Sequence, residues 1–155
     1  MNSSLAIRLA TSDEYLKFHD ICDNDLPHPL SIEGRLKQRR REFAQIEEGL
    51  RVAYFAEKEG QVVGSVQLRL RYKAPEEGLI HALIVQRQHR RTKIGTQLMD
   101  AVETEASRRS YRRIWLTVHS SNDAARHFYE KHRYTEVSTD ISTDGERTIE
   151  MEKKI

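Results

Sequence analysis

Two periodicities of apolar residues run along this chain, and each predicts one kind of secondary structure. In the segment 61–72 apolar and polar positions alternate, which is typical of a strand with one buried face and one wet face. The segment 79–85 is almost entirely apolar, as expected of a central strand that is covered on both faces. Further strand patterns lie at 5–9, 51–57, 114–118, 134–138 and 147–153.

Helical spacing of apolar residues fills most of the remaining chain. The predicted helices span about 12–22, 31–48, 94–110 and 122–132. The segment 23–29 contains two prolines and is expected to be a loop. Hairpins require antiparallel neighbours, whereas the strand–helix–strand units of the second half require parallel ones. We therefore predict an α/β (α+β) fold, in which a mixed sheet of six to seven strands is packed against about four helices.

Composition narrows the class of protein. The 155 residues fit a single domain spanning 1–155. Lys and Arg (26) nearly balance Asp and Glu (24), so the net charge of +2 gives no argument for a nucleic-acid partner, which we do not expect. The single cysteine, Cys22, excludes an internal disulfide and suits a reducing compartment. Since no apolar run approaches the roughly 20 residues of a membrane span and no signal-peptide pattern is present, we expect a cytoplasmic protein with no membrane partner.

The segment 85–99 carries the most distinctive local pattern. An apolar strand ends at Val85, a basic turn follows, and apolar positions then resume with helical spacing. A helix N-terminus presents unpaired backbone N–H groups and a partial positive charge, and Arg90, Arg91 and Lys93 add cations beside it. We therefore expect a phosphate-bearing ligand at this turn.

Two motifs, together with the order of elements, resemble the GNAT superfamily of N-acetyltransferases. Residues 90–95 read Arg-Arg-Thr-Lys-Ile-Gly, which is similar to the family signature R-x-x-G-x-G/A. Asn122, Ala125, Phe128 and Tyr129 have the spacing of the family segment N-x-x-A-x-x-F-Y. The resemblance implies a GNAT-like fold, in which the two central strands splay apart around the cofactor.

The resemblance also implies acetyl-CoA as co-substrate. Backbone groups of the strand that ends at Val85 would meet the pantetheine arm, and a bulge near Ala82 would open the sheet there. Backbone amides of the basic turn would hold the pyrophosphate, and Asn122 would contact the cofactor near its pantetheine portion. The implied cofactor-binding residues are Leu83, Ile84, Val85, Arg90, Arg91, Thr92, Lys93, Ile94, Gly95, Thr96 and Asn122.

The chain departs from the family pattern at two glycine positions. Lys93 replaces the first glycine of the signature, which lets the backbone approach a phosphate without a Cβ in the way. The lysine could clash with the cofactor, or its ammonium could offset the loss by reaching a phosphate oxygen. We expect weakened to normal binding. Arg133-Tyr134 replaces the Gly-Phe that precedes the sixth strand in the family, so a different turn is expected there.

Tyr129 is the candidate for protonating the departing thiolate, because the resemblance places its phenol near the thioester sulfur. The alternative is an aromatic side chain packed on the sheet, with its hydroxyl bonded to a carbonyl.

His81 is the candidate general base. Its parity with Leu83 and Val85 places the three on one strand face, and an imidazole titrates near neutral pH. A core histidine with satisfied hydrogen bonds is the alternative. Glu76 and Glu77, just before the strand, could act through a water, although such residues more often form a solvated turn.

The resulting prediction is an N-acetyltransferase that moves the acetyl group directly to a primary amine of a small molecule or a peptide. One alternative is a module of the same fold that binds or senses acyl-CoA without turnover. A nucleic-acid binder that uses the arginine runs is a third class and predicts strong salt dependence. No metal is expected, since the histidines show no metal-binding spacing. The chain could form a homodimer, and the sequence does not decide its oligomeric state.

Overall fold

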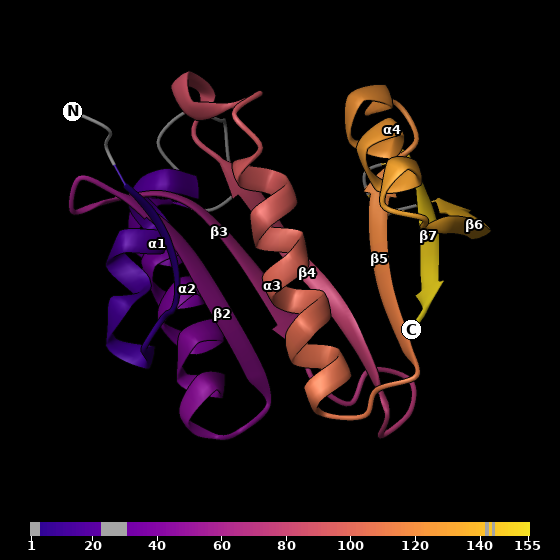
Figure 1. Cartoon of the computed structure of the whole chain (residues 1–155), viewed down its shortest axis with the longest axis horizontal. Coiled ribbons are helices and arrows are strands. Elements are labelled where there is room, and N and C mark those ends of the chain that lie inside the picture. The colour runs from indigo at the N-terminus through magenta and orange to yellow at the C-terminus, as the bar shows by residue number, and fades with distance from the viewer. Residues whose placement is uncertain (1–3, 23–30, 142, 144) are drawn as a thin grey trace.

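The computed structural model describes residues 4–22, 31–141, 143 and 145–155, which form a seven-stranded sheet with helices on both faces (Figure 1). The strands lie in the order β1-β2-β3-β4-β5-β7-β6. Only β4 and β5 pair in parallel, so the sheet is mixed, as predicted. The strands are β1 (Leu5–Leu9), β2 (Arg51–Lys58), β3 (Gln61–Arg69), β4 (Glu77–Val85), β5 (Arg113–His119), β6 (Thr135–Ile141) and β7 (Arg147–Lys154).

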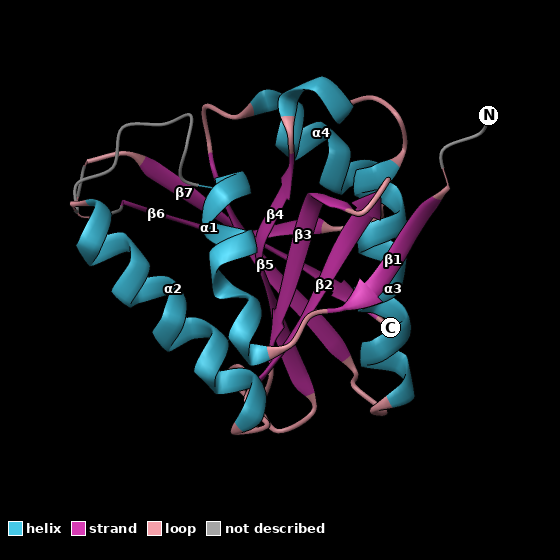
Figure 2. Ribbon diagram, turned by 90° about the vertical axis from the view of Figure 1, so that its left-hand side faces the viewer, coloured by secondary structure: helices cyan, strands magenta, loops and turns pink. Residues whose placement is uncertain are grey.

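Two helices cover each face of the sheet. α1 and α2 lie on one face, and α3 and α4 lie on the other (Figure 2). No helix in the described part of the chain is both long enough and apolar enough to cross a membrane. The helices are α1 (Tyr15–Cys22), α2 (Ile32–Glu47), α3 (Ile94–Arg108) and α4 (Asp123–Lys131), with 3₁₀ turns at Ser12–Glu14 and Arg87–His89.

The helices of the first half begin at capping residues that the sequence predicts. The Oγ of Ser31 accepts a hydrogen bond of 3.1 Å from the backbone N–H of Gly34, which sets the start of α2. Thr11 precedes the 3₁₀ turn that leads into α1, and its N–H donates to the Glu14 carboxylate at 3.0 Å. The predicted loop at 23–29 lies outside the described residues.

Each face of the sheet has its own hydrophobic core. The larger core joins the sheet to α3, where Leu98, Met99 and Val102 are fully buried. The smaller core lies under α1 and α2, where Phe43 stacks on Phe18 at a centroid distance of 5.5 Å. The larger core therefore holds α3, and the basic turn before it, against the centre of the sheet.

Strand β3 alternates as predicted from Gly64 onward, but its second face is dry. Val62, predicted to share a face with Gly64 and Val66, packs in the other core, because a bulge at Val63 shifts the pairing with β2. Ser65 and Gln67, which we expected on a wet face, have no exposed surface. Helices α1 and α2 cover this face, and Arg51 links Gln45 of α2 to the Gln67 amide. Only the assembled tertiary structure brings these helices over β3, so strand alternation alone could not indicate the burial.

The two central strands separate along most of their length. β4 and β5 pair only through Glu77–Leu79 with Arg113–Trp115, and beyond that point the ladder stops. On its other side β4 contains the bulge predicted near Ala82, since the pairing with β3 shifts there and Ala82 has φ +53°. The sheet therefore has a gap between its halves that begins after Leu79.

Candidate active site

The basic turn enters α3 through two residues in the left-handed backbone region. Arg91 has φ +63° and Lys93, the N-cap of α3, has φ +66°. Glycine adopts this conformation without steric cost, whereas a residue with a Cβ pays a penalty. The positive φ explains why the R-x-x-G-x-G/A signature has a glycine at the place that Lys93 occupies in this chain. The chain keeps the glycine-type backbone there while carrying a lysine.

The first turn of α3 leaves its amide donors available. Among the described residues, no side chain caps this helix, and nothing accepts from the N–H groups of Ile94, Gly95 and Thr96. The first backbone bond of the helix runs from Gln97 N to Lys93 O at 3.1 Å. Three unpaired donors next to arginine and lysine side chains suit a phosphate or pyrophosphate group.

Gly95 of α3 faces Phe128 of α4, and there is room for a Cβ at this position. A Cβ placed on Gly95 would lie 3.4 Å from Cζ of Phe128, which is van der Waals contact. Asn122 begins α4 by accepting a hydrogen bond of 3.1 Å from the backbone N–H of Ala125. Asn122 therefore has a structural function, and its contact with a cofactor stays a prediction.

Tyr129 projects from α4 into a largely apolar environment. Its ring makes edge contacts with Phe128 at 5.6 Å and Tyr134 at 6.2 Å between centroids. Burial raises the pKa of Tyr129 to about 12, so the phenol is neutral near pH 7 and can donate a proton. No residue in the described ranges forms a hydrogen bond with this hydroxyl, in contrast to Tyr134, whose hydroxyl donates to Glu103.

His81 lies on the opposite face from the one its parity indicated. Leu83 and Val85 pack against the core under α3, whereas His81 lies on the face covered by α2, directly across from Gln67. The grouping of His81 with Leu83 and Val85 was therefore wrong. The bulge at Ala82 adds one residue to the strand and reverses the alternation beyond it.

The surroundings of His81 favour its neutral form. Its side chain is exposed at the surface, yet nearby protein atoms remove part of its hydration, and this desolvation lowers its pKa. Glu42 opposes the effect. Three cations act in the same direction as the desolvation, namely Arg51, Arg39 and Arg69. A neutral imidazole is the form that accepts a proton.

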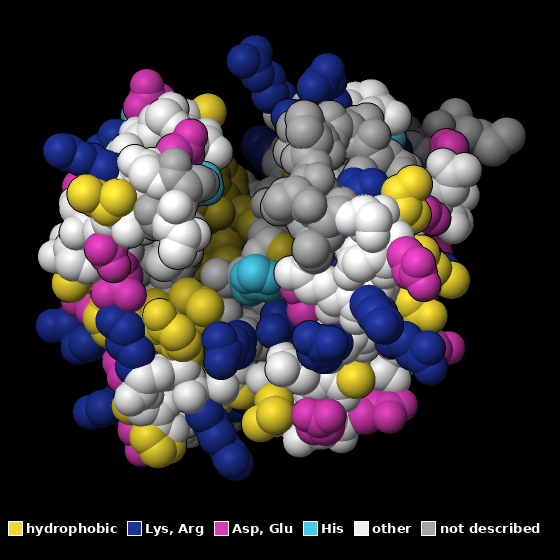
Figure 3. All heavy atoms as spheres, turned by 180° about the vertical axis from the view of Figure 1, so that it is seen from behind, with side chains coloured by type: hydrophobic (Ala, Val, Ile, Leu, Met, Phe, Trp, Pro, Cys, Tyr) yellow, Lys and Arg dark blue, Asp and Glu magenta, His cyan; other side chains and the backbone are white. Residues whose placement is uncertain are grey.

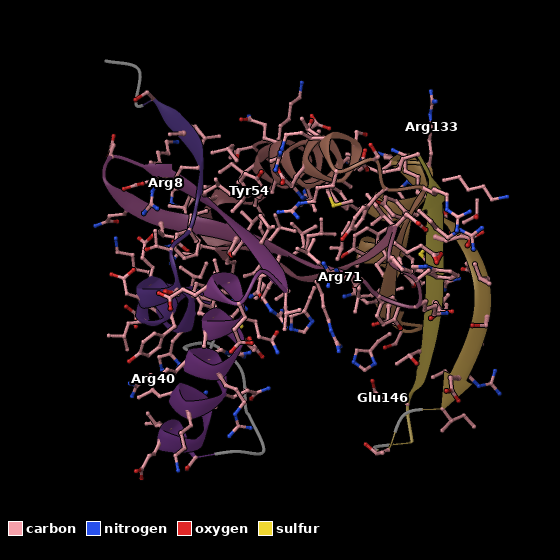
Figure 4. The ribbon with its side chains drawn as sticks, turned by 90° about the horizontal axis from the view of Figure 1, so that it is seen from below. Arg8, Arg40, Tyr54, Arg71, Arg133 and Glu146 are labelled. Atoms are coloured by element: carbon pink, nitrogen blue, oxygen red, sulfur yellow. The ribbon has the colours of Figure 1, made fainter. Side chains whose placement is uncertain are left out.

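A second histidine faces the gap from the other side. His119 ends β5, and its Nδ1 lies 3.0 Å from Oε2 of Glu146. A carboxylate at Nδ1 leaves Nε2 as the proton acceptor of the neutral ring. Sequence reasoning missed this pair, which lies 27 positions apart and meets through the pairing of β5 with β7, where His119 opposes Thr148. In Figure 4, Glu146 lies just before the start of β7, on the opposite side of the view from α2.

The face that carries α1 and α2 is hollowed between the two halves of the molecule (Figure 3). Hydrophobic side chains lie deep in the hollow, and a histidine lies near its floor. Tyr129 approaches from the other face of the sheet, on α4, which packs with α3. The gap between β4 and β5 thus separates the basic turn and α3 on one face from a hollow with titratable groups on the other. Within the described residues, no group of three or more His, Cys, Asp or Glu side chains could hold a metal ion.

Comparison with known proteins identifies the family. The model of the acetyltransferase (GNAT) family matches residues 15–134. N-alpha-acetyltransferase 60 of Drosophila melanogaster is 41% identical over 66 residues, which cover 41% of this chain and about a quarter (24%) of that protein. The ribosomal-protein-S18-alanine N-acetyltransferase of Escherichia coli superposes with a TM-score of 0.80 at 20% identity, covering 98% of this chain and 94% of that one.

A further solved structure carries a ligand. PaiA N-acetyltransferase of Thermoplasma acidophilum, in complex with coenzyme A, has a TM-score of 0.77 at 16% identity and covers 98% of this chain and 99% of that one. These superpositions match the seven-stranded sheet and four α-helices described above. Since the family model spans most of the sequence, this chain belongs to the acetyltransferase (GNAT) family.

Proposed function

We propose that this protein transfers an acetyl group from acetyl-CoA directly to a primary amine. The observation that carries the proposal is the gap between β4 and β5, which lies beside the uncapped N-terminus of α3. A thioester lying in this gap would be reachable from both faces of the sheet. The coenzyme A complex of the Thermoplasma acidophilum relative supports the same donor.

The residues around the gap have backbone groups that could bind the pyrophosphate and the pantetheine arm of acetyl-CoA. The unpaired N–H groups of Ile94, Gly95 and Thr96 would bind the pyrophosphate, with help from the side chains of the turn. Leu83, Ile84 and Val85 form the part of β4 that has no β5 partner, so backbone groups there would meet the pantetheine arm. Their edge of the sheet is open, which is what an added strand-like ligand requires.

Acetyl transfer has three chemical requirements, and the site offers a group for two of them. The amine must lose a proton, the tetrahedral oxyanion must be stabilised, and the departing thiolate must gain a proton. We assign the last step to Tyr129, whose neutral hydroxyl has no partner among the described residues. The proton goes from the phenol to sulfur as the carbon–sulfur bond breaks, and solvent then restores the phenol.

Two histidines compete for the role of general base. His81, the residue predicted from sequence, is held neutral by its environment. His119 is oriented by Glu146. Both lie on the hollowed face, where an amine would approach the thioester from the side opposite to α3. Matched variants, described in the Discussion, separate the two.

The acceptor is proposed to be an amine of a peptide or a small molecule. The names of two relatives refer to protein amino groups, and they favour a peptide. A cytoplasmic location and the absence of a metal cofactor stay predictions.

Two linked measurements test the proposal. Isothermal calorimetry should show acetyl-CoA binding, and a thiol-release assay over a panel of peptide and small-molecule amines should show turnover. If acetyl-CoA binds and no amine in the panel is acetylated, the alternative of a non-catalytic acyl-CoA sensor is supported. If acetyl-CoA does not bind at all, both functions are wrong.

A further inference from the structure

A pocket lined by cations lies at the end of β3, on the same side of the sheet as His81. Its volume is about 290 Å³, and its lining includes Arg69, Arg71, Lys73, Gln45 and Tyr72. No carboxylate lines it. Leu50 and Leu70 form the apolar part of its wall. A pocket of this size with three cationic side chains around it suits an anion such as a carboxylate or a phosphate.

Two of the three cations make no ion pair. Lys73 is neutralised by Glu150, whose Oε1 lies 2.7 Å from Nζ. Arg69 and Arg71 are both exposed, and neither pairs with a carboxylate of the described residues. In Figure 4, Arg71 lies in the middle of the molecule seen from below, between α2 and β7. Arg71 is thus a surface residue that lies between the two halves of the molecule in this view.

No carboxylate of the described residues forms a hydrogen bond with the buried Arg51 or Gln67 beside the pocket, and Glu42 acts on Arg51 only electrostatically. Arg51 is 7% exposed, and its guanidinium binds the amide oxygens of Gln45 and Gln67 rather than a carboxylate. Burial lowers the pKa of Arg51, Glu42 opposes this effect, and Arg69 adds to it. Gln67 is fully buried, and its Nε2 has no hydrogen-bond partner among the described residues. The cluster thus contains more donors and positive charge than acceptors.

The pocket lies close to the proposed chemistry. Arg69 follows Gln67 by two positions on the same face of β3, and Gln67 is directly opposite His81. Two residues of a strand span about 7 Å. Arg69 also acts electrostatically on His81. Figure 3 shows Lys and Arg side chains gathered just below the histidine in the hollow. If the amine of an acceptor lies near His81, a group roughly 7 Å from that amine would therefore reach Arg69.

We infer that this pocket binds an anionic group of the acceptor, so that the enzyme selects amines that carry a carboxylate or a phosphate about two residue lengths from the nitrogen. The inference rests on the proposed function. In a peptide acceptor the anionic group would belong to an acidic or phosphorylated side chain near the amino terminus. In a small acceptor it would be a carboxylate or phosphate on the same molecule.

The test compares acceptors that differ only in charge. Peptides with Asp, Asn or Lys at positions 2 and 3, a phosphoserine peptide and its serine form, and small amines with and without a phosphate are assayed for kcat/KM. The kcat/KM of acidic acceptors should be about tenfold higher, because their KM is lower. A tenfold difference corresponds to one charge-assisted hydrogen bond. The preference should fall as salt rises. The peptide and small-amine arms distinguish the two sources of the anion.

The double variant Arg69→Gln/Arg71→Gln should reduce the preference, measured as the ratio of kcat/KM on acidic and neutral acceptors, to less than about twofold. Arg40→Gln is the matched control, since Arg40 is exposed on α2 and lines a different surface pocket. Activity without an acidic preference, or a preference that the double variant retains, would overturn the inference and leave the proposed function intact.

A binding measurement keeps the inference testable without turnover. In the presence of coenzyme A, calorimetry should show tighter binding of the Asp peptide than of the Asn peptide to the wild type, and equal binding to the double variant. If no amine is acetylated, the proposed function fails, and this measurement still decides whether the anion site exists. Binding of a short RNA as tightly as the Asp peptide would contradict an acceptor site.

Discussion

The Nε of Arg90 donates a hydrogen bond of 2.9 Å to the backbone carbonyl of Val85, tying the basic turn to the end of β4. Both residues belong to the predicted cofactor-binding set. The bond holds the start of the turn against the strand that borders the gap. The terminal nitrogens of the Arg90 guanidinium have no carboxylate partner in the described structure.

Replacing Arg90 by Gln should weaken acetyl-CoA binding by about tenfold, because the variant loses both a cation beside the pyrophosphate and the bond to Val85. Calorimetry measures the affinity. Arg87→Gln is the control, since Arg87 is exposed in the preceding 3₁₀ turn. Equal effects of the two substitutions would show that only general charge matters.

Lys93→Gly should preserve or tighten acetyl-CoA binding and stabilise the fold. Relief of the left-handed backbone is worth about 1–2 kcal/mol, and the greater chain entropy of glycine offsets about 0.5–1 kcal/mol of it. Chemical denaturation and calorimetry measure the two effects. Arg133→Gly is the matched control, because Arg133 also has a positive φ (+71°) but lies outside the predicted cofactor turn. It should gain similar stability with no change in affinity. A large loss of binding in Lys93→Gly alone would show that the ammonium holds a phosphate.

Tyr129→Phe should lower kcat by about 100-fold, as expected for loss of a general acid, and change acetyl-CoA affinity little. Steady-state kinetics and calorimetry separate the two effects. Tyr134→Phe is the control, since the neighbouring Tyr134 already bonds its hydroxyl to Glu103. An unchanged rate in Tyr129→Phe would remove this residue from the mechanism.

The acid limb of the pH–rate profile should identify the base. A general base works in its neutral form, so the rate falls as pH drops through the pKa of that group. Because the pKa of His81 is lowered in the folded protein, a His81-dependent limb should lie below the ordinary histidine value of about 6.5. His81→Gln should then abolish this limb and reduce kcat, while His119→Gln should retain it. The reverse result would assign the base to His119 and Glu146.

The hydrogen bonds of the Glu14 carboxylate should be lost in acid, so the free energy of unfolding should fall as pH is lowered. Arg8 Nη2 lies 2.7 Å from Glu14 Oε2, and this hydrogen bond, the largest cause, lowers the pKa of Glu14 well below 4.5. Its contribution is therefore full above about pH 4.5 and is lost as pH falls below it. Glu14→Gln should reduce the free energy of unfolding at pH 7 by about 1–3 kcal/mol, and the difference should shrink towards pH 3. Denaturation at several pH values measures this, with the exposed turn residue Glu59→Gln as control.

Local patterns predicted the elements well. The cap at Ser31 and the basic turn that ends at Lys93 were both located from sequence, because each depends on interactions within a few neighbouring residues. The strand alternation of β3 was correct from Gly64 onward, although its second face is buried and Val62 lies on that face. Helix α2 covers that face, and the sequence of β3 itself does not indicate which helix will pack on it.

The sequence by itself determined the order of the strands and helices along the chain, the basic turn before α3 and the placement of Tyr129 on α4. The tertiary structure decided which groups meet. The bulge at Ala82 moved His81 to the face under α2, and the pairing of β5 with β7 brought His119 to Glu146. Secondary structure depends on periodicity and capping over short distances, whereas a site is made from strand register and from contacts between segments far apart in the chain.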